Sequence, residues 1–196
     1  GIIMRTIIAL APMAGVTDKV FRSLCFSKGC ALATTEMVSA QGFLSAPKSM
    51  NVYRFLLERA PNESDLRVQI FGCEPRFMAD AAYRLSDLGL YNGIDINMGC
   101  PARKVTGSGG GSALLKSPAL CGEIVRAVTR ATALPVSVKI RLGWDEQSQN
   151  AVEIARICEE NGAKMLTVHG RTREQQYAGH ADWAAIARVK QAVGIP

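Results

Sequence analysis

The chain has 196 residues, 48% of them hydrophobic, which is enough for one sizeable core, and no apolar run is long enough to span a membrane, so we expect no membrane partner. The six cysteines show no CxxC pair and no metal-type spacing with histidine, which favours a cytoplasmic enzyme with scattered thiols over a disulfide framework or a metal site. The net charge of +6 and the pI of about 9.2 permit nucleic-acid binding without requiring it.

Short β-prone runs alternate with amphipathic helical patterns along the chain. Strands are predicted at residues 7–11, 32–35, 67–71, 93–97, 136–140 and 165–168. Helices are predicted at residues 17–28, 50–57, 75–88, 118–131 and 150–161 and after residue 182, with Thr17, Ser117 and Asp182 as N-terminal caps. The segments 37–47 and 61–65 read as loops.

Six strand–helix units in strict alternation imply a parallel sheet with helices outside it. Polar or ligand-type side chains follow nearly every strand, namely Met13, Glu36, Gln69, Asn97, Cys100, Lys139, Arg141, His169 and Arg171. A TIM barrel places its site at these carboxyl ends, whereas a doubly wound sheet concentrates ligand residues near one switch point. We therefore predict an α/β chain of the (β/α)8 TIM-barrel type, with residues 1–196 as one catalytic domain. It is incomplete, because strands seven and eight are absent.

The stretch Asp95-Ile96-Asn97-Met98-Gly99-Cys100-Pro101 displays a thiol in a turn directly after a strand. No acidic residue lies between Asp95 and Glu123, which favours an anionic partner. The glycine run 107–112 lacks the third glycine of a dinucleotide fingerprint and is not a P-loop. We predict that it is a mobile loop that approaches a large ligand, with closure as a lid as a hypothesis.

Cys100 has three readings: a nucleophile, a general acid, or a small buried hydrophobe. No histidine lies near it in sequence, which favours the proton donor over the nucleophile. Lys139 and Arg141 alternate with apolar residues, so both point to one side of their strand and require an anionic partner or a cofactor unless that strand end is solvated.

His169 begins a polar loop, and a structural and a functional role are equally open. Gln69 is an amide inside an apolar strand, and its partner is either a neighbouring loop or a flat heteroaromatic ring. The turn Pro12-Met13-Ala14 is either ordinary or a soft apolar surface for such a ring.

Several linked motifs resemble the tRNA-dihydrouridine synthases, in a bacterial branch close to the B-type. The motifs are Ala11-Pro12-Met13-Ala14-Gly15-Val16-Thr17-Asp18 with Phe21-Arg22, the stretch 95–101 with Val105, Lys139-Ile140-Arg141, and His169-Gly170-Arg171-Thr172 with Gln176, Tyr177, Gly179, Asp182 and Trp183. The resemblance covers essentially the whole chain.

The resemblance implies FMN-dependent reduction of the C5–C6 bond of uridines in tRNA, with NADPH as the usual reductant and Cys100 as the proton donor. It implies flavin contacts from Pro12, Met13, Ala14, Gln69, Lys139 and His169. It implies substrate contacts from Asn97, Arg103, Lys104, Arg141, Arg171 and Arg173, the arginines and Lys104 lining the mouth of the site.

Members of that family continue into two further strands, whose loops hold the FMN phosphate, and into a helical tRNA-binding domain. We therefore expect this chain alone to bind FMN weakly and tRNA poorly, and its first and sixth strands to be open edges that favour self-association. Two alternatives remain open. One is another FMN barrel oxidoreductase that acts on a free pyrimidine, like dihydroorotate dehydrogenase, and the other is a non-catalytic RNA-binding fragment.

Overall fold

A parallel sheet of seven strands forms the centre of the protein in a computed structural model that describes residues 7–47 and 51–196. The strand order is β1-β2-β4-β5-β6-β7, and β3 pairs with the end of β4. The strands are β1 (Ala9–Leu10), β2 (Leu32–Thr34), β3 (Val38–Ser39), β4 (Leu66–Phe71), β5 (Gly93–Met98), β6 (Val136–Arg141) and β7 (Met165–His169). The described strands pair in parallel throughout this sheet, as strict strand–helix alternation predicts.

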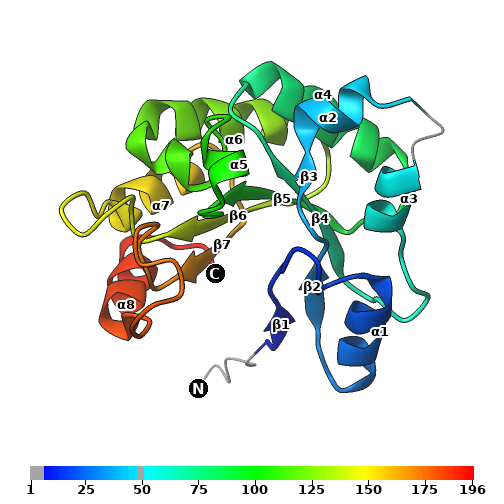
Figure 1. Ribbon diagram of the computed structural model, residues 1–196, viewed down its shortest axis with the longest axis horizontal. Coiled ribbons are helices and arrows are strands. Elements are labelled where there is room, and N and C mark those ends of the chain that lie inside the picture. The colour runs from blue at the N-terminus through cyan, green and yellow to red at the C-terminus, as the bar shows by residue number, and fades with distance from the viewer. Residues whose placement is uncertain (1–6, 48–50) are drawn as a thin grey trace.

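Helices cover the outer face of the sheet, and its inner face stays open between β1 and β7 (Figure 1). The helices are α1 (Lys19–Ser27), α2 (Ala40–Ser45), α3 (Asn51–Leu57), α4 (Pro75–Asp87), α5 (Arg103–Thr106), α6 (Pro118–Ala131), α7 (Ala151–Glu160) and α8 (Trp183–Ala192), with a 3-10 helix η1 (Gly111–Lys116). This arrangement is an incomplete (β/α)8 barrel, so the predicted fold class is confirmed. Within residues 7–47 and 51–196, no helix has the length and apolar character needed to cross a membrane.

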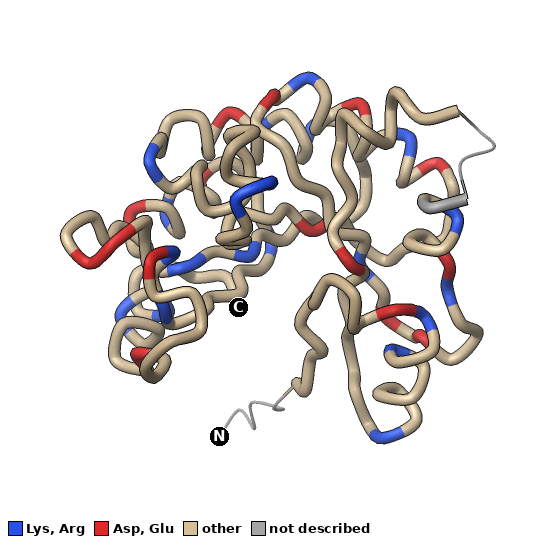
Figure 2. Tube along the Cα trace, viewed as in Figure 1, with Lys and Arg blue, Asp and Glu red and all other residues tan. Residues whose placement is uncertain are grey.

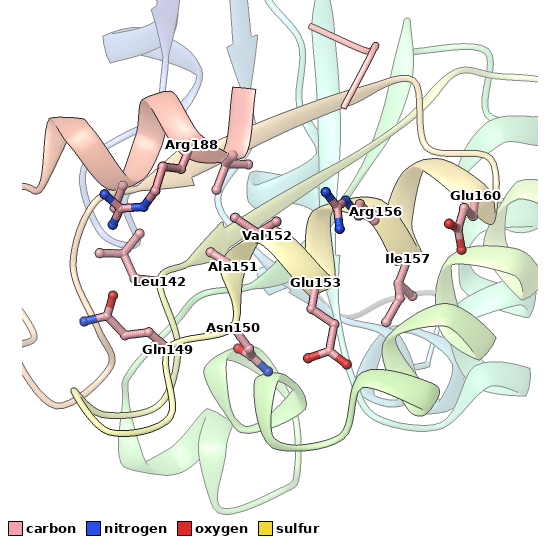
Figure 3. A pocket seen from close by; sticks show the side chains of 12 residues that line it. Leu142, Gln149, Asn150, Ala151, Val152, Glu153, Arg156, Ile157, Glu160 and Arg188 are labelled. Carbon is pink, nitrogen blue, oxygen red and sulfur yellow. The ribbon is translucent and has the colours of Figure 1, made fainter. Parts of the chain in front are cut away.

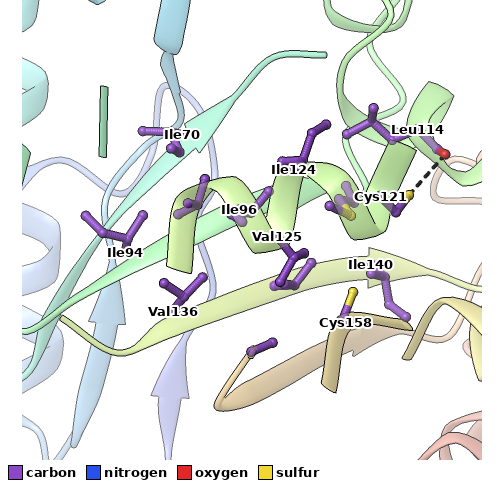
Figure 4. Close-up of a cluster of buried hydrophobic side chains, with 14 of the residues drawn as sticks. Ile70, Ile94, Ile96, Leu114, Cys121, Ile124, Val125, Val136, Ile140 and Cys158 are labelled. Carbon is purple, nitrogen blue, oxygen red and sulfur yellow. Dashed lines mark hydrogen bonds between the residues drawn. The ribbon is translucent and has the colours of Figure 1, made fainter. Parts of the chain in front are cut away.

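The core lies between the sheet and its outer helices. Ile94 and Ile96 of β5 and Ile140 of β6 point outward and pack against α6 and α7, where Ile124 and Cys158 are fully buried (Figure 4). The alternate residues of the same strands point to the inner face of the half-barrel. Each strand therefore builds the core with one set of side chains and the inner surface with the other.

Two local predictions were wrong. Residues 37–47 are not a loop, because they form β3 and then α2, which Ser39 caps by accepting a hydrogen bond from the Gly42 amide at 3.1 Å. The cap of α1 is Asp18 and not Thr17, since the Asp18 carboxylate accepts from the Phe21 amide at 2.8 Å. Met50, the predicted start of the next helix, lies outside the described residues, and α3 begins at Asn51.

The end of the glycine run packs closely, while Gly107 and Ser108 at its start are exposed, and its mobility stays a prediction. The run leaves the end of α5 and enters η1, whose first five residues are buried. Gly111 has a φ of +58°, and a Cβ at this position would lie 2.7 Å from the Cys100 carbonyl oxygen. Gly111 therefore lies directly against the Cys100 turn, where only glycine fits.

A buried ion pair ties α1 to the loop before β4. Arg22 is 1% exposed, and its Nε donates to Glu63 Oε1 at 2.6 Å. The other guanidinium nitrogens donate to the carbonyls of Thr17 and Glu58, and Glu63 Oε2 accepts from the Ala60 amide. Every strong polar group of this pair is thus satisfied, and removing one partner would leave the other charge buried.

We expect Arg22→Met to lower the free energy of unfolding by about 3–5 kcal/mol, because it leaves the Glu63 carboxylate uncompensated. The matched control is Lys19→Met, which breaks the partly exposed Lys19–Glu58 pair and should cost about 0–1 kcal/mol. Urea unfolding measures both. Equal effects of the two substitutions would contradict this account of the buried pair.

Candidate active site

A cavity of about 850 Å³ opens at the carboxyl ends of the strands, a size typical of ligand sites. One wall is apolar and comes from the loop after β1, and the other is polar and comes from β4 to β7. The lining residues are Ala11, Pro12, Met13, Ala14, Val16, Met37, Gln69, Asn97, Gly99, Cys100, Pro101, Ala102, Arg103, Lys139, Arg141, His169, Gln176 and Tyr177.

A buried hydrogen-bonded network around Asp95 lies beneath Gln69 and Asn97 of the cavity wall. The strand register places Gln69, Asp95 and Ser137 side by side on β4, β5 and β6. Asp95 is 3% exposed and accepts from Gln69 Nε2 at 2.7 Å and from Ser137 Oγ at 2.5 Å. Burial raises the pKa of Asp95, while these two hydrogen bonds and the charge of Lys139 act in the opposite direction.

Asn97 extends this network to the Cys100 turn. Its Nδ2 donates to Gln69 Oε1 at 2.9 Å, and its Oδ1 accepts from the amides of Gly99 and Cys100 at 3.1 and 2.9 Å. Both ends of the Gln69 amide are therefore bonded to side chains of the neighbouring strand β5, which neither reading of the sequence foresaw. Asn97 holds the turn in place, and the substrate and flavin contacts expected of Asn97 and Gln69 stay predictions.

Cys100 is half-buried on the cavity wall, with its backbone fixed on both sides. Its amide is held by Asn97, and its carbonyl accepts from the Ser112 amide at 3.0 Å and from Ser112 Oγ at 2.9 Å. A thiol on a rigid turn that faces a cavity is suited to proton transfer, which depends on position first.

Lys139 lines the cavity without a hydrogen bond or an ion pair to any residue that the structure describes. Burial lowers the pKa of Lys139, the nearby Asp95 carboxylate raises it, and Arg141 lowers it further. A half-buried ammonium group without a partner is suited to an anionic or oxygen-rich ligand.

Arg141 lies beneath the cavity and not at an exposed mouth, because only 3% of it is exposed. Its Nε donates to the Gly99 carbonyl at 2.8 Å, and its Nη1 donates to the carbonyls of Thr172 and Gln176 at 3.0 and 2.7 Å. It thereby joins the Cys100 turn after β5 to the loop after β7. Its predicted contact with substrate stays a prediction beside this observed structural role.

His169 ends β7 on the cavity wall, next to Arg171 and Tyr177. Arg171 Nη1 lies 3.0 Å from His169 Nε2, and the rings of His169 and Tyr177 are 6.4 Å apart between centroids. Burial and the charges of Arg141, Lys139 and Arg171 lower the pKa of His169 to about 4.

The structure gathers ten of the predicted site residues around this cavity and leaves three outside its wall. The three are Lys104, Arg171 and Arg173. Arg173 stacks on Trp144, with its guanidinium carbon 4.3 Å from the ring centroid, and Lys116 Nζ lies 4.2 Å from the same ring. Figure 2 shows the basic segments of β6 and of the loop after β7 on the same side of the half-barrel.

Sequence reasoning assigned no role to Asp95 or Ser137 in this site, although Asp95 accepts hydrogen bonds from Gln69 of the cavity wall and from Ser137. The alternation that placed Lys139 and Arg141 on one side of their strand also places Asp95 with Asn97, and that signal could have found Asp95. Met37 and Ala102 also line the cavity, but no pattern in the sequence indicated it. Among residues 7–47 and 51–196, no cluster of three metal-ligand side chains occurs.

Another cavity, of about 600 Å³, lies outside the barrel between α7 and α8 (Figure 3). Its lining includes Glu153, Arg156 and Arg188 beside Leu142 and Ile157. The residues predicted for the site do not line this second cavity.

Comparisons with known proteins agree on one family. The family model described as "Dihydrouridine synthase (Dus)" matches residues 9–196. The chain is 47% identical over 188 residues to tRNA-dihydrouridine synthase B of Pseudomonas aeruginosa, covering 95% of this chain and 55% of the relative. It is 46% identical to the probable tRNA-dihydrouridine synthase 1 of Synechocystis, covering 95% and 51%. The chain thus spans about half the length of these relatives, and the sequence resemblance is confirmed.

A comparison of folds gives a broader likeness. The carboxyl transferase domain of Rhizobium etli pyruvate carboxylase superposes with a TM-score of 0.54 at 13% identity, over 95% of this chain and 33% of that one. At this identity the likeness concerns the fold alone, and it agrees with the incomplete barrel described above.

We expect Asn97→Ala to lower the free energy of unfolding by about 2–4 kcal/mol, because it strips the amides of Gly99 and Cys100 of their acceptor and Gln69 Oε1 of its donor. Asn62→Ala is the matched control, since Asn62 makes its hydrogen bonds with Ser23 at the surface and should cost about 1 kcal/mol or less. Urea unfolding measures both, and a loss at Asn97 no larger than at Asn62 would rule out the positioning role.

Proposed function

Because the chain belongs to the dihydrouridine synthase family, we propose that it forms the catalytic cavity of a cytoplasmic enzyme that reduces the C5–C6 bond of uridines in tRNA. The observation that carries the proposal is the meeting of Cys100, Lys139 and His169 on one cavity wall, opposite an apolar wall. The tRNA-modifying names of the relatives support the choice of substrate.

The residues around the cavity fit FMN as the cofactor. Pro12, Met13 and Ala14 offer an apolar surface for a flat ring, and Lys139 offers an ammonium group without a partner among the described residues. When bound, FMN would supply the hydride for C6 of the uracil ring, with NADPH as the reductant that restores it. Lys139 then stabilises negative charge on the ligand's oxygen-rich edge.

Cys100 completes the reduction by donating its thiol proton to C5, where negative charge develops. The S–H bond breaks, a C–H bond forms, and the thiolate later recovers a proton from solvent. A negative charge on Cys100 interacts favourably with Lys139 and Arg141, an effect that opposes the lowering of their pKa by burial.

Contacts with tRNA begin at the mouth of the cavity. Arg103 lies on its wall, and Lys104 is its exposed neighbour on α5, in a stretch free of acidic residues. Their charges attract phosphates, which dominate affinity for nucleic acids. The target uridine leaves its stack to reach the cavity, where the exposed ring of Tyr177 offers a surface for stacking.

We expect Cys100→Ala to reduce dihydrouridine formation about 10²-fold or more without changing the affinity for FMN, because it removes only the acid. The assay uses the full natural chain that contains these residues, with unmodified tRNA transcript, FMN and NADPH, and mass spectrometry of the nucleosides. Cys73→Ala is the control, since Cys73 lies off the cavity wall and donates to the Ser108 carbonyl. Full activity of the Cys100 variant would remove it from the mechanism.

We expect Lys139→Met to weaken FMN binding about 10–100-fold, equivalent to about 1.4–2.8 kcal/mol, because FMN loses its contact with the ammonium group that the substitution removes. Quenching of FMN fluorescence during titration with the chain measures the dissociation constant. Lys104→Met removes the same charge at an exposed position off the cavity wall and should leave FMN affinity unchanged. Equal affinities of the two variants would place the flavin elsewhere.

A further inference from the structure

The contact between Arg171 and His169 fixes which ring nitrogen carries a proton. Arg171 Nη1 lies 3.0 Å from His169 Nε2. A guanidinium group has only donors, so Nε2 has to accept the hydrogen bond and cannot itself be protonated. A neutral His169 then carries its proton on Nδ1, and a cationic His169 would place an N–H against another N–H.

Arg171 is held in this position by its own loop. Its Nε donates to the Ala178 carbonyl at 3.1 Å, and its Nη2 donates to the Gly179 carbonyl at 2.9 Å. The backbones of the two residues are also joined, since the Arg171 amide donates to the His169 carbonyl at 2.8 Å. The guanidinium is thus fixed by the fold on two further sides, and its third side faces the imidazole.

The charges around His169 favour the neutral form. Lys139 and Arg141 of β6 and Arg171 of its own loop are cations, and the nearest aromatic group is Tyr177. Within the described part of the chain, no carboxylate forms a hydrogen bond or an ion pair with the ring. Burial and these cations together lower the pKa of His169 to about 4.

We propose that Arg171 is a positioning residue that locks His169 as the neutral Nδ1–H tautomer, so that His169 serves the cavity as a fixed hydrogen-bond donor. Nδ1 has no partner among the described residues, and the ring lines the cavity. His169 and Lys139 then both present donors, which selects a ligand edge rich in acceptors. Near neutral pH the proton for reduction has to come from another group, and Cys100 is the thiol on the same wall.

The tautomer of His169 can be measured without turnover, because NMR detects its ring nitrogens directly. The tautomer lock can therefore fail while the proposed reduction of uridine stands, and the proposed reduction can fail while the tautomer lock stands. The predicted contact of Arg171 with tRNA stays a prediction beside this role toward His169.

The test is long-range proton–nitrogen NMR of the ¹⁵N-labelled chain, which distinguishes the two neutral tautomers and the cation. The chain has two histidines, so His180→Asn leaves His169 as the only source of signal. We expect a protonated Nδ1 and an unprotonated Nε2 at neutral pH. The same pattern should persist to about pH 5, one unit above the pKa of about 4.

Arg171→Met should shift His169 toward the Nε2–H tautomer and raise its pKa, which stays below the ordinary value because burial and the charges of Arg141 and Lys139 remain. Arg173→Met is the matched control, since it removes the same charge from the same loop, where Arg173 stacks on Trp144. It should leave the tautomer unchanged.

Two results would overturn the proposal. One is an Nε2–H tautomer or a cationic ring in the unsubstituted chain at neutral pH. The other is an unchanged tautomer and an unchanged titration in Arg171→Met. The first measurement needs no substitution at Arg171, so the proposal stays testable even where that variant fails to fold.

Discussion

The Asp95 carboxylate is the constraint on which the candidate site depends. It is buried on the inner face of β5, and it is compensated by Gln69 and Ser137 from the two neighbouring strands. Through Gln69 the same network orients Asn97, and Asn97 holds the amides of the Cys100 turn. A buried carboxylate tolerates little displacement of its donors, so the register of β4, β5 and β6 also fixes the position of the thiol.

The same strands supply both the stability and the chemistry. Ile94 and Ile96 face the helices, and Asp95 and Asn97 alternate with them on the inner face. A register slip of one residue would bury the polar set in the core and expose the apolar set. Burial of the apolar outer face thus stabilises strands whose inner face is polar.

The strands and the faces of their side chains could be predicted from the sequence, because both depend on the local pattern of apolar and polar residues. Period-two alternation gave the main strands and the shared side of Lys139 and Arg141. Contacts between distant segments could not be predicted. The role of Gly111 depends on the Cys100 carbonyl, and the bonds of Gln69 depend on strand register, which no single segment encodes. The α2 helix was missed because a glycine lies inside a helix of six residues.

The basic residues around the cavity are of two kinds, which differ in whether their hydrogen-bond donors already have partners in the protein. Arg141 uses its donors on backbone carbonyls that join the Cys100 turn to the loop after β7, and Arg171 uses its donors within that loop and on His169. Lys139 keeps its ammonium group for the cavity. Asp95 beneath it accepts from Gln69 and Ser137 and forms no ion pair with Lys139 among the described residues, so the donors of the ammonium group stay free for a ligand. A ligand that brings acceptors or negative charge to this wall is therefore bound by groups that the fold has already oriented, which reduces the reorganisation needed for catalysis.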